Sequence, residues 1–193
     1  MLPPVLEQER QSIQQVYAAL AADEARNAMI FNDILQALED KRSPVILTER
    51  KDHALLLAEK VSRFARNVIV LTGGVGAKQR RAAMQRIGDV SATDERVLIA
   101  TGRYIGEGFD DARLDTLFLA MPISWKGTLE QYVGRLHRSY ATKREVAVYD
   151  YVDEAVPVLK RMSEKRIRGH KSLGYSIDAY ASSPSASEML PIP

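Results

Sequence analysis

The sequence predicts an α/β protein in which helices flank a parallel β-sheet. From residue 44 onward, short apolar runs alternate with longer segments whose apolar residues recur every three or four positions. The apolar runs are continuous rather than alternating, which is typical of parallel strands that helices bury on both faces. The length of 193 residues suits one such domain with extensions at its ends.

The first 42 residues are expected to form a helical extension ahead of the sheet. Residues 5–20 have the apolar periodicity of an amphipathic helix. Asp23 is a suitable N-cap for a second helix, which carries Ile30 and Ile34 on one side. Pro44 then ends the helical region, because a proline disfavours helical conformation in the residue before it.

The remaining elements follow in alternation as far as residue 175. The expected strands cover residues 45–48, 68–72, 96–101, 116–120 and 145–152. The expected helices cover residues 52–65, 77–87, 128–138 and 157–170. We therefore place one domain at residues 43–175. A tail at residues 176–193 follows it, and the Ser- and Pro-rich end of this tail is expected to be disordered.

The composition limits the kinds of site that the chain can carry. There is no cysteine, which excludes disulfides, thiolate metal sites and cysteine nucleophiles. The three histidines are scattered and form no metal-binding pattern. No run approaches the roughly 18 apolar residues of a membrane span, and the N-terminus has no signal pattern. We expect a cytoplasmic protein with no membrane partner.

Basic residues gather on the last expected helix, although the net charge of the chain is only +2. The group consists of Lys160, Arg161, Lys165, Arg166, Arg168, His170 and Lys171. Two interpretations remain open. The residues form either a solvated helix face or a surface that contacts the phosphate backbone of a nucleic acid.

Three expected strands end in threonine or glycine. These positions are Thr48 after the first strand, Thr72, Gly73 and Gly74 after the second, and Thr101 and Gly102 after the third. In open α/β sheets, ligands bind beyond the carboxyl ends of the strands. Hydroxyl groups and glycine amides at that edge suit backbone phosphates, although the same residue types are common in ordinary turns.

The segment at residues 131–138 carries two arginines one helical turn apart. At 3.6 residues per turn, Gln131, Arg135 and Arg138 share one helix face. Two guanidinium groups so spaced suit a nucleotide phosphate, because each presents a planar fork of donors. The alternatives are a surface ion-pair arrangement for the arginines and a helix-capping role for Gln131. Gly134 lies in mid-helix, where glycine usually indicates a close approach.

Three segments of the chain resemble sequence motifs of superfamily 2 helicases. Residues 131–138 resemble motif VI, with the pattern Gln-x-x-Gly-Arg-x-x-Arg. Residues 97–102 with 106–110 resemble motif V, and residues 44–50 resemble motif IV. Their order and spacing also agree, over roughly residues 23–175. The resemblance is to the second, C-terminal RecA-like domain of a DEAD/DEAH-type helicase, in the neighbourhood of restriction-type and XPB-like enzymes.

The resemblance implies a role for each group of residues. Arg135 and Arg138 would be catalytic arginine fingers, and Gln131, Gly108 and Asp110 would face ATP. Nucleic acid, with DNA favoured, would contact the residues at the carboxyl edge, namely Thr48, Arg50, Gly73, Gly74, Thr101 and Gly102. Many relatives have arginine after the motif VI Gln, where this chain has Tyr132.

The sequence lacks the motifs that hold ATP and Mg²⁺ in a complete motor. Neither Gly-x-x-x-x-Gly-Lys-Ser/Thr nor an acidic box is present, and residues 72–79 imitate a P-loop with Gln79 in the place of its Ser or Thr. ATP and Mg²⁺ would then be held mainly by an N-terminal RecA-like domain outside this chain. We expect the chain alone to be inactive.

The sequence leaves two other function classes to compare. A non-catalytic nucleic-acid-binding or regulatory RecA-like module is the main alternative to a motor half. A Rossmann-type enzyme is disfavoured, because no Gly-x-Gly-x-x-Gly follows any expected strand.

Overall fold

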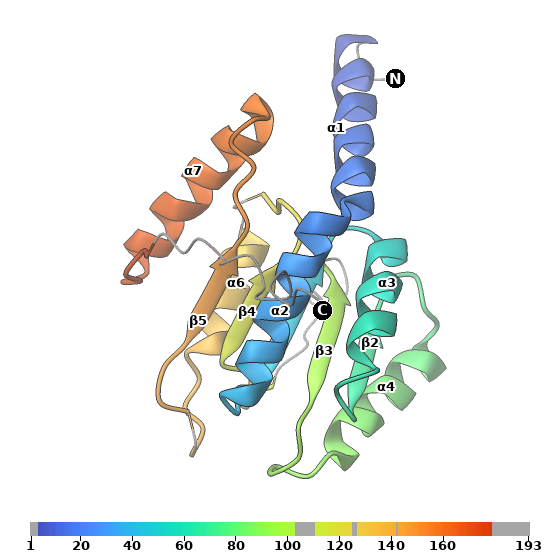
Figure 1. Ribbon diagram of the computed structural model, residues 1–193, viewed down its shortest axis with the longest axis vertical. Helices are drawn as coiled ribbons and strands as arrows, with labels where there is room; N and C mark the ends of the chain where they lie inside the picture. Colours follow the sequence, from blue (N-terminus) through green and yellow to red (C-terminus); the bar gives the residue numbers. More distant parts are fainter. Residues whose placement is uncertain (1–3, 103–110, 125–126, 142, 179–193) are drawn as a thin grey trace, which may run out of the picture.

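The computed structural model describes residues 4–102, 111–124, 127–141 and 143–178, and its centre is a five-stranded sheet (Figure 1). The strands are β1 (Pro44–Thr48), β2 (Val68–Leu71), β3 (Val97–Thr101), β4 (Thr116–Leu119) and β5 (Ala147–Asp150). They lie in the order β2-β3-β1-β4-β5, and every neighbouring pair is parallel. The predicted α/β class with a parallel sheet is confirmed.

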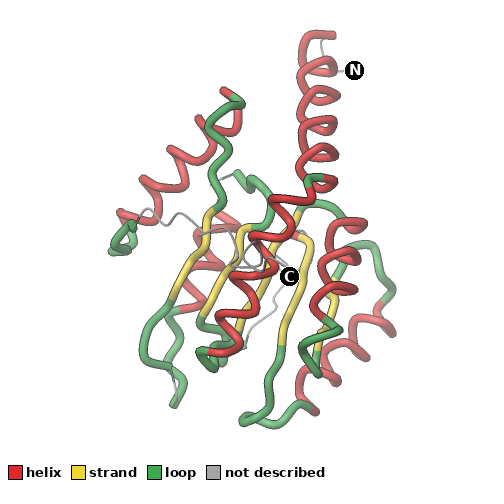
Figure 2. The backbone as a smooth tube through the Cα atoms, viewed as in Figure 1, coloured by secondary structure: helices red, strands yellow, loops and turns green. Residues whose placement is uncertain are grey.

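Helices cover both faces of the sheet, as the continuous apolar strands predict (Figures 1 and 2). The helices of the structure are α1 (Pro4–Ala22), α2 (Glu24–Glu39), α3 (Lys51–Val61), α4 (Ala77–Asp89), α6 (Gly127–Leu136) and α7 (Pro157–Ser172). One apolar cluster packs α2 and α3 on one face, and a second packs α4 and α6 on the other. The pleat of β1 divides its side chains between them, with Ile46 in the first cluster and Val45 and Leu47 in the second.

Of the two N-terminal helices, α2 packs on the sheet and α1 does not. Asp23 caps α2 as predicted, accepting a hydrogen bond from the Arg26 amide at 3.0 Å. Ile30 and Ile34 of α2 are fully buried against the sheet, so packing places α2 in the helical layer. Of these two helices, α1 is the one that projects away from the body of the domain (Figure 1). The expected extension at residues 1–42 thus divides into a projecting helix and a packed one.

The basic group on α7 is not a single exposed surface. Arg166 is 1% exposed and forms a two-pronged ion pair with Asp150, in which both N–O distances are 2.8 Å. It also donates to the Ile123 carbonyl at 3.1 Å. His170 is buried as well. A phosphate-contacting role for these two residues is therefore wrong, because their side chains face the interior. The other five basic residues of the group are exposed.

Within the described part of the chain, no helix has the length and apolar character needed to cross a membrane.

Candidate nucleotide and nucleic-acid interface

The strand ends that were predicted to share an edge do lie together. The three strands that end in threonine or glycine, β2, β3 and β1, are direct neighbours in the sheet. Thr48 pairs in register with Thr101, and the Gly73 amide donates to the Thr101 hydroxyl at 3.0 Å. Thr48, Thr101 and Gly73 therefore form a continuous row at the carboxyl edge.

Several polar groups of this row bond to one another. The Thr48 side chain is fully buried, and its hydroxyl lies 2.9 Å from His53 Nδ1 and 3.3 Å from the Arg50 amide. The Gly73 amide donates its hydrogen bond to the hydroxyl of Thr101, and the Thr101 side chain is only 8% exposed. Contacts of these groups with nucleic acid stay predictions. The Thr48 hydroxyl belongs to the interior rather than to a surface that a ligand reaches.

Charged side chains at the same edge are balanced. Arg50 holds Asp52 by two bonds, of 3.0 Å from Nε and 2.5 Å from Nη2. A Cβ on Gly102 would lie 2.9 Å from the Glu49 carboxylate, so Gly102 leaves room for that side chain. Burial raises the pKa of Glu49. The edge thus offers a phosphate no excess of positive charge around Arg50 and Gly102.

In the segment that imitates a P-loop, Gln79 has a structural role. The Gly76 amide, ahead of α4, donates to Gln79 Oε1 at 3.3 Å. Gln79 therefore caps the start of the helix, where a P-loop would use Ser or Thr for Mg²⁺. Gly74 adopts a φ of +80°, which glycine reaches without strain.

A buried chain of hydrogen bonds links this edge to the joint between α1 and α2. Asn27 donates from Nδ2 to the Ala21 carbonyl at 2.9 Å, so its Oδ1 accepts from His53 Nε2 at 2.9 Å. His53 Nδ1 is then the acceptor for the Thr48 hydroxyl. The bond from Thr48 requires the neutral imidazole, because Nδ1 must accept a hydrogen bond there, and the bond to Asn27 requires the proton on Nε2. Burial lowers the pKa of His53 to about 4.

Stability should therefore fall as the pH drops from about 6.5 to 4. The unfolded chain binds a proton at His53 near its ordinary pKa of 6.5, whereas the folded chain does so only near 4. Folding thus becomes less favourable across this window by up to about 3 kcal/mol, and no further below it. Urea unfolding of the wild type and of His53→Gln at pH 7, 5.5 and 4 measures the effect.

The variant His53→Gln should lose clearly less stability over this window than the wild type. His137→Gln is the matched control, because His137 is exposed. His170 shifts in the same direction through burial, and it is present in all three proteins. Equal pH dependence of the wild type and His53→Gln would contradict the assignment.

The helix that carries the two arginines is α6. Tyr132, Val133 and Leu136 bury one side of it in the core, as the sequence predicts, and Arg135 lies on its half-buried flank. A Cβ on Gly134 would meet nothing within 4 Å. The close approach expected at Gly134 is thus not made by the described part of the chain.

The end of α6 differs from the prediction. The helix stops at Leu136 rather than at residue 138, so Arg138 lies in the turn that follows. The His137 amide donates to the Gly134 carbonyl at 3.3 Å, and the Arg138 amide to the Arg135 carbonyl at 3.1 Å. These tighter bonds close the last turn. Arg138 is exposed.

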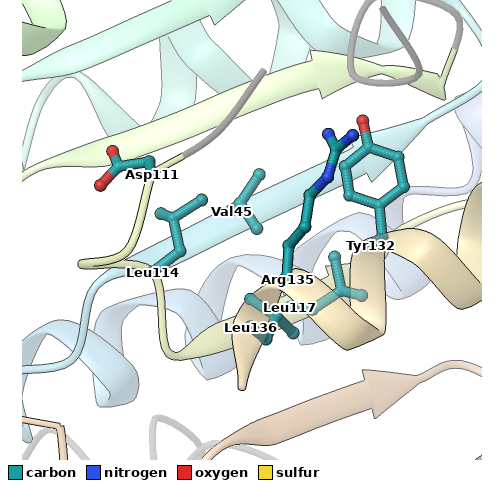
Figure 3. A pocket seen from close by; sticks show the side chains of 7 residues that line it. All are labelled: Val45, Asp111, Leu114, Leu117, Tyr132, Arg135 and Leu136. Carbon is teal, nitrogen blue, oxygen red and sulfur yellow. The ribbon is translucent and has the colours of Figure 1, made fainter. Parts of the chain in front are cut away.

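A small pocket with mostly apolar lining lies between α6 and Asp111, the residue that follows the motif V-like segment (Figure 3). Arg135 and Tyr132 rise side by side from α6, with the guanidinium carbon 5.9 Å from the centre of the ring. Asp111 lies across the pocket, and Val45 and Leu114 are between them. Asp111 is fixed by a buried ion pair with Arg96. Two residues 24 positions apart, Asp111 and Arg135, thus line one site.

Some predicted site residues cannot be placed. Gly108 and Asp110 and the side chain of Gln131 lie outside the part of the chain that the structure describes. One further residue at the pocket, Asp111, did not stand out in the sequence. Its neighbour Asp110 was the only signal. Among the described residues, no group of His, Asp and Glu has the arrangement of a metal site.

Comparison with known proteins supports the fold. No protein-family model matches the chain. The structure resembles T4 UvsW with a TM-score of 0.64 and 15% identity, covering 82% of this chain and 35% of that one. It resembles the C-terminal domain of the DEAD-box protein Dbp5 with a TM-score of 0.56 and 20% identity, covering 76% and 79%. The chain therefore has the RecA-like fold of a helicase C-terminal domain.

The curated relatives are also distant in sequence. Transcript termination protein A18 of Fowlpox virus is 22% identical over 146 residues, which cover 75% of this chain and 31% of the viral protein. Transcript termination protein OPG145 of Variola virus is 23% identical over 145 residues, which cover 74% and 29%. The chain thus spans about a third of the length of these relatives. The expected restriction-type or XPB-like neighbourhood stays a prediction.

Proposed function

We propose that this chain is the C-terminal motor half of an ATP-dependent nucleic-acid helicase or translocase. The observation that carries the proposal is the pocket that Asp111 and Arg135 share, because Asp111 directly follows the motif V-like segment and Arg135 belongs to the motif VI-like segment of a helicase-type fold. An N-terminal RecA-like domain would supply the P-loop and the acidic box that this sequence lacks. ATP and Mg²⁺ would lie between the two domains.

The arginines would act on the charge that develops during hydrolysis. Negative charge spreads over the transferring phosphoryl group, and a guanidinium from a second domain stabilises it. Arg135 and Arg138 fit this role, since Arg135 leaves α6 beside the pocket and Arg138 follows in an exposed turn. Gln131, Gly108 and Asp110 would complete the contacts with ATP. The open space at Gly134 would admit the partner domain.

Nucleic acid would run along the carboxyl edge of the sheet. Gly74 and Gly102 there can present backbone amides, whereas Arg50 is balanced by Asp52. Backbone phosphates are the natural ligands of such groups. The names of the viral relatives, transcript termination proteins, support a nucleic acid as the partner. DNA is our preferred substrate, and a cytoplasmic location is our proposal for the protein.

The chain alone should neither hydrolyse ATP nor bind nucleic acid tightly. It lacks the phosphate and Mg²⁺ ligands, and half of the track is absent. Phosphate release and binding of labelled single-stranded DNA and RNA, each at two salt concentrations, test this. We expect no turnover and weak binding that falls steeply with salt.

Two outcomes would contradict the proposal. Turnover by the isolated chain that Arg135→Ala abolishes would mean that the chain contains a complete nucleotide site. Tight, salt-insensitive and sequence-specific binding would favour a nucleic-acid-binding module that reads bases, rather than a motor track.

A further inference from the structure

One side chain from beyond α6 holds the turn that carries Arg138. Lys143 Nζ donates to the carbonyl oxygens of Leu136 and Arg138, both at 2.8 Å. The first of these carbonyls ends the helix, and the second belongs to the candidate finger itself. A single ammonium group therefore fixes the backbone on both sides of the helix end.

The position of Lys143 suits this contact. The last carbonyls of a helix have no partner within the helix, and a cation near them is favoured by the helix dipole. Lys143 is only partly exposed. Burial lowers its pKa, while the nearby carboxylates of Asp115 and Asp111 act in the opposite direction. The ammonium group thus replaces hydrogen bonds to water with hydrogen bonds to two carbonyl oxygens at the end of α6.

The body of α6 does not depend on this lysine. Tyr132, Val133 and Leu136 anchor the helix in the core. The turn after it has other contacts in the described part of the chain. The His137 ring packs edge-on against Tyr175 at 5.2 Å between centres, and the Arg138 amide bonds to the Arg135 carbonyl. Loss of Lys143 would thus loosen the turn and leave the helix in place.

We propose that Lys143 is a positioning residue for Arg138, holding its backbone where the guanidinium can reach the transferring phosphoryl group. This inference rests on the proposed function of Arg138. A finger acts only in a narrow geometry, and misplacing a catalytic group by about 1 Å can cost roughly 10²-fold in rate. The lysine itself would touch no ligand.

The experiment compares Lys143→Met and Lys143→Arg with the wild type in the protein that joins this chain to its P-loop domain. Lys143→Met keeps the length of the side chain and removes the donors. We expect it to lower kcat by about 10²-fold, with the KM for ATP within about twofold. Lys143→Arg, which keeps a cationic donor, should recover much of the loss. Arg144→Met is the matched control, because Arg144 is the exposed neighbour, and it should leave kcat unchanged.

Two further readouts separate positioning from general stability. In the chain alone, Lys143→Met should raise hydrogen exchange at the Arg138 amide about tenfold or more without changing exchange in the α6 core. In the joined protein, Lys143→Met should add nothing to Arg138→Ala, because both act through one group. A kcat within twofold of the wild type, or a loss that parallels unfolding, would overturn the inference.

The two proposals fail in different ways. If Arg138→Ala keeps full turnover, the proposed function of Arg138 is wrong. If Arg138→Ala abolishes turnover while Lys143→Met does not lower it, the motor proposal stands and only the positioning role is overturned.

Discussion

Replacing Arg138 by alanine is expected to lower ATP turnover by about 10³-fold or more in the protein that contains both motor domains. The affinity for ATP should change little. The guanidinium acts on charge that appears in the transition state, whereas most ground-state binding comes from the P-loop domain. Steady-state hydrolysis and nucleotide titration, each with and without nucleic acid, measure the two quantities.

A matched control separates this effect from loss of folding. Arg138 is exposed after the end of α6, so the variant should unfold within about 0.5 kcal/mol of the wild type. Arg144→Ala removes a nearby exposed cation and should leave turnover unchanged. If Arg138→Ala retains wild-type turnover, or loses it only through unfolding, Arg138 is a surface ion-pairing residue and not a finger.

Replacing Arg166 by alanine should have the largest effect on stability. The change leaves the Asp150 carboxylate, which is 14% exposed, without its two-pronged partner in the interior. Removing one member of a buried pair costs about 3–5 kcal/mol. Urea or guanidinium unfolding of the chain alone measures this loss.

The neighbouring helix position provides the control. Lys165 is exposed on α7, so Lys165→Ala should change stability by no more than about 0.5 kcal/mol. The double variant Arg166→Met with Asp150→Leu should recover much of the loss, because an apolar pair can replace a buried ion pair. Equal unfolding of Arg166→Ala and Lys165→Ala would mean that the Asp150 contact contributes nothing.

The sequence predicted the elements of the fold well because their signals are local. Continuous apolar runs located all five strands, and Asp23 marked the start of α2. The end of α6 was missed by two residues, since the group that caps it, Lys143, comes later in the chain. The burial of Arg166 was missed for the same reason. Its partner Asp150 lies 16 residues away, and charge alone indicates exposure.

The candidate site was predictable as a location but not as a set of contacts. Strand ends that resemble one another predicted the shared edge, and the structure places them on neighbouring strands. The internal bonds of that edge depend on His53 and Asn27, which are 26 positions apart, and no spacing rule joins them. The pairing of Asp111 with Arg96 is likewise a product of the tertiary fold.

The strand order has a consequence for how the growing chain can fold during synthesis. β1 lies at the centre of the sheet, yet both of its partners, β3 and β4, are made after β2. The first two strands of this sheet to be made, β1 and β2, are not neighbours, so this sheet cannot start to form until β3 has emerged. Until then, the apolar side chains of Ile46 and Leu47 in β1 can pack only against helices and not within a sheet. This domain is therefore most prone to aggregation while its chain has been made only as far as β2.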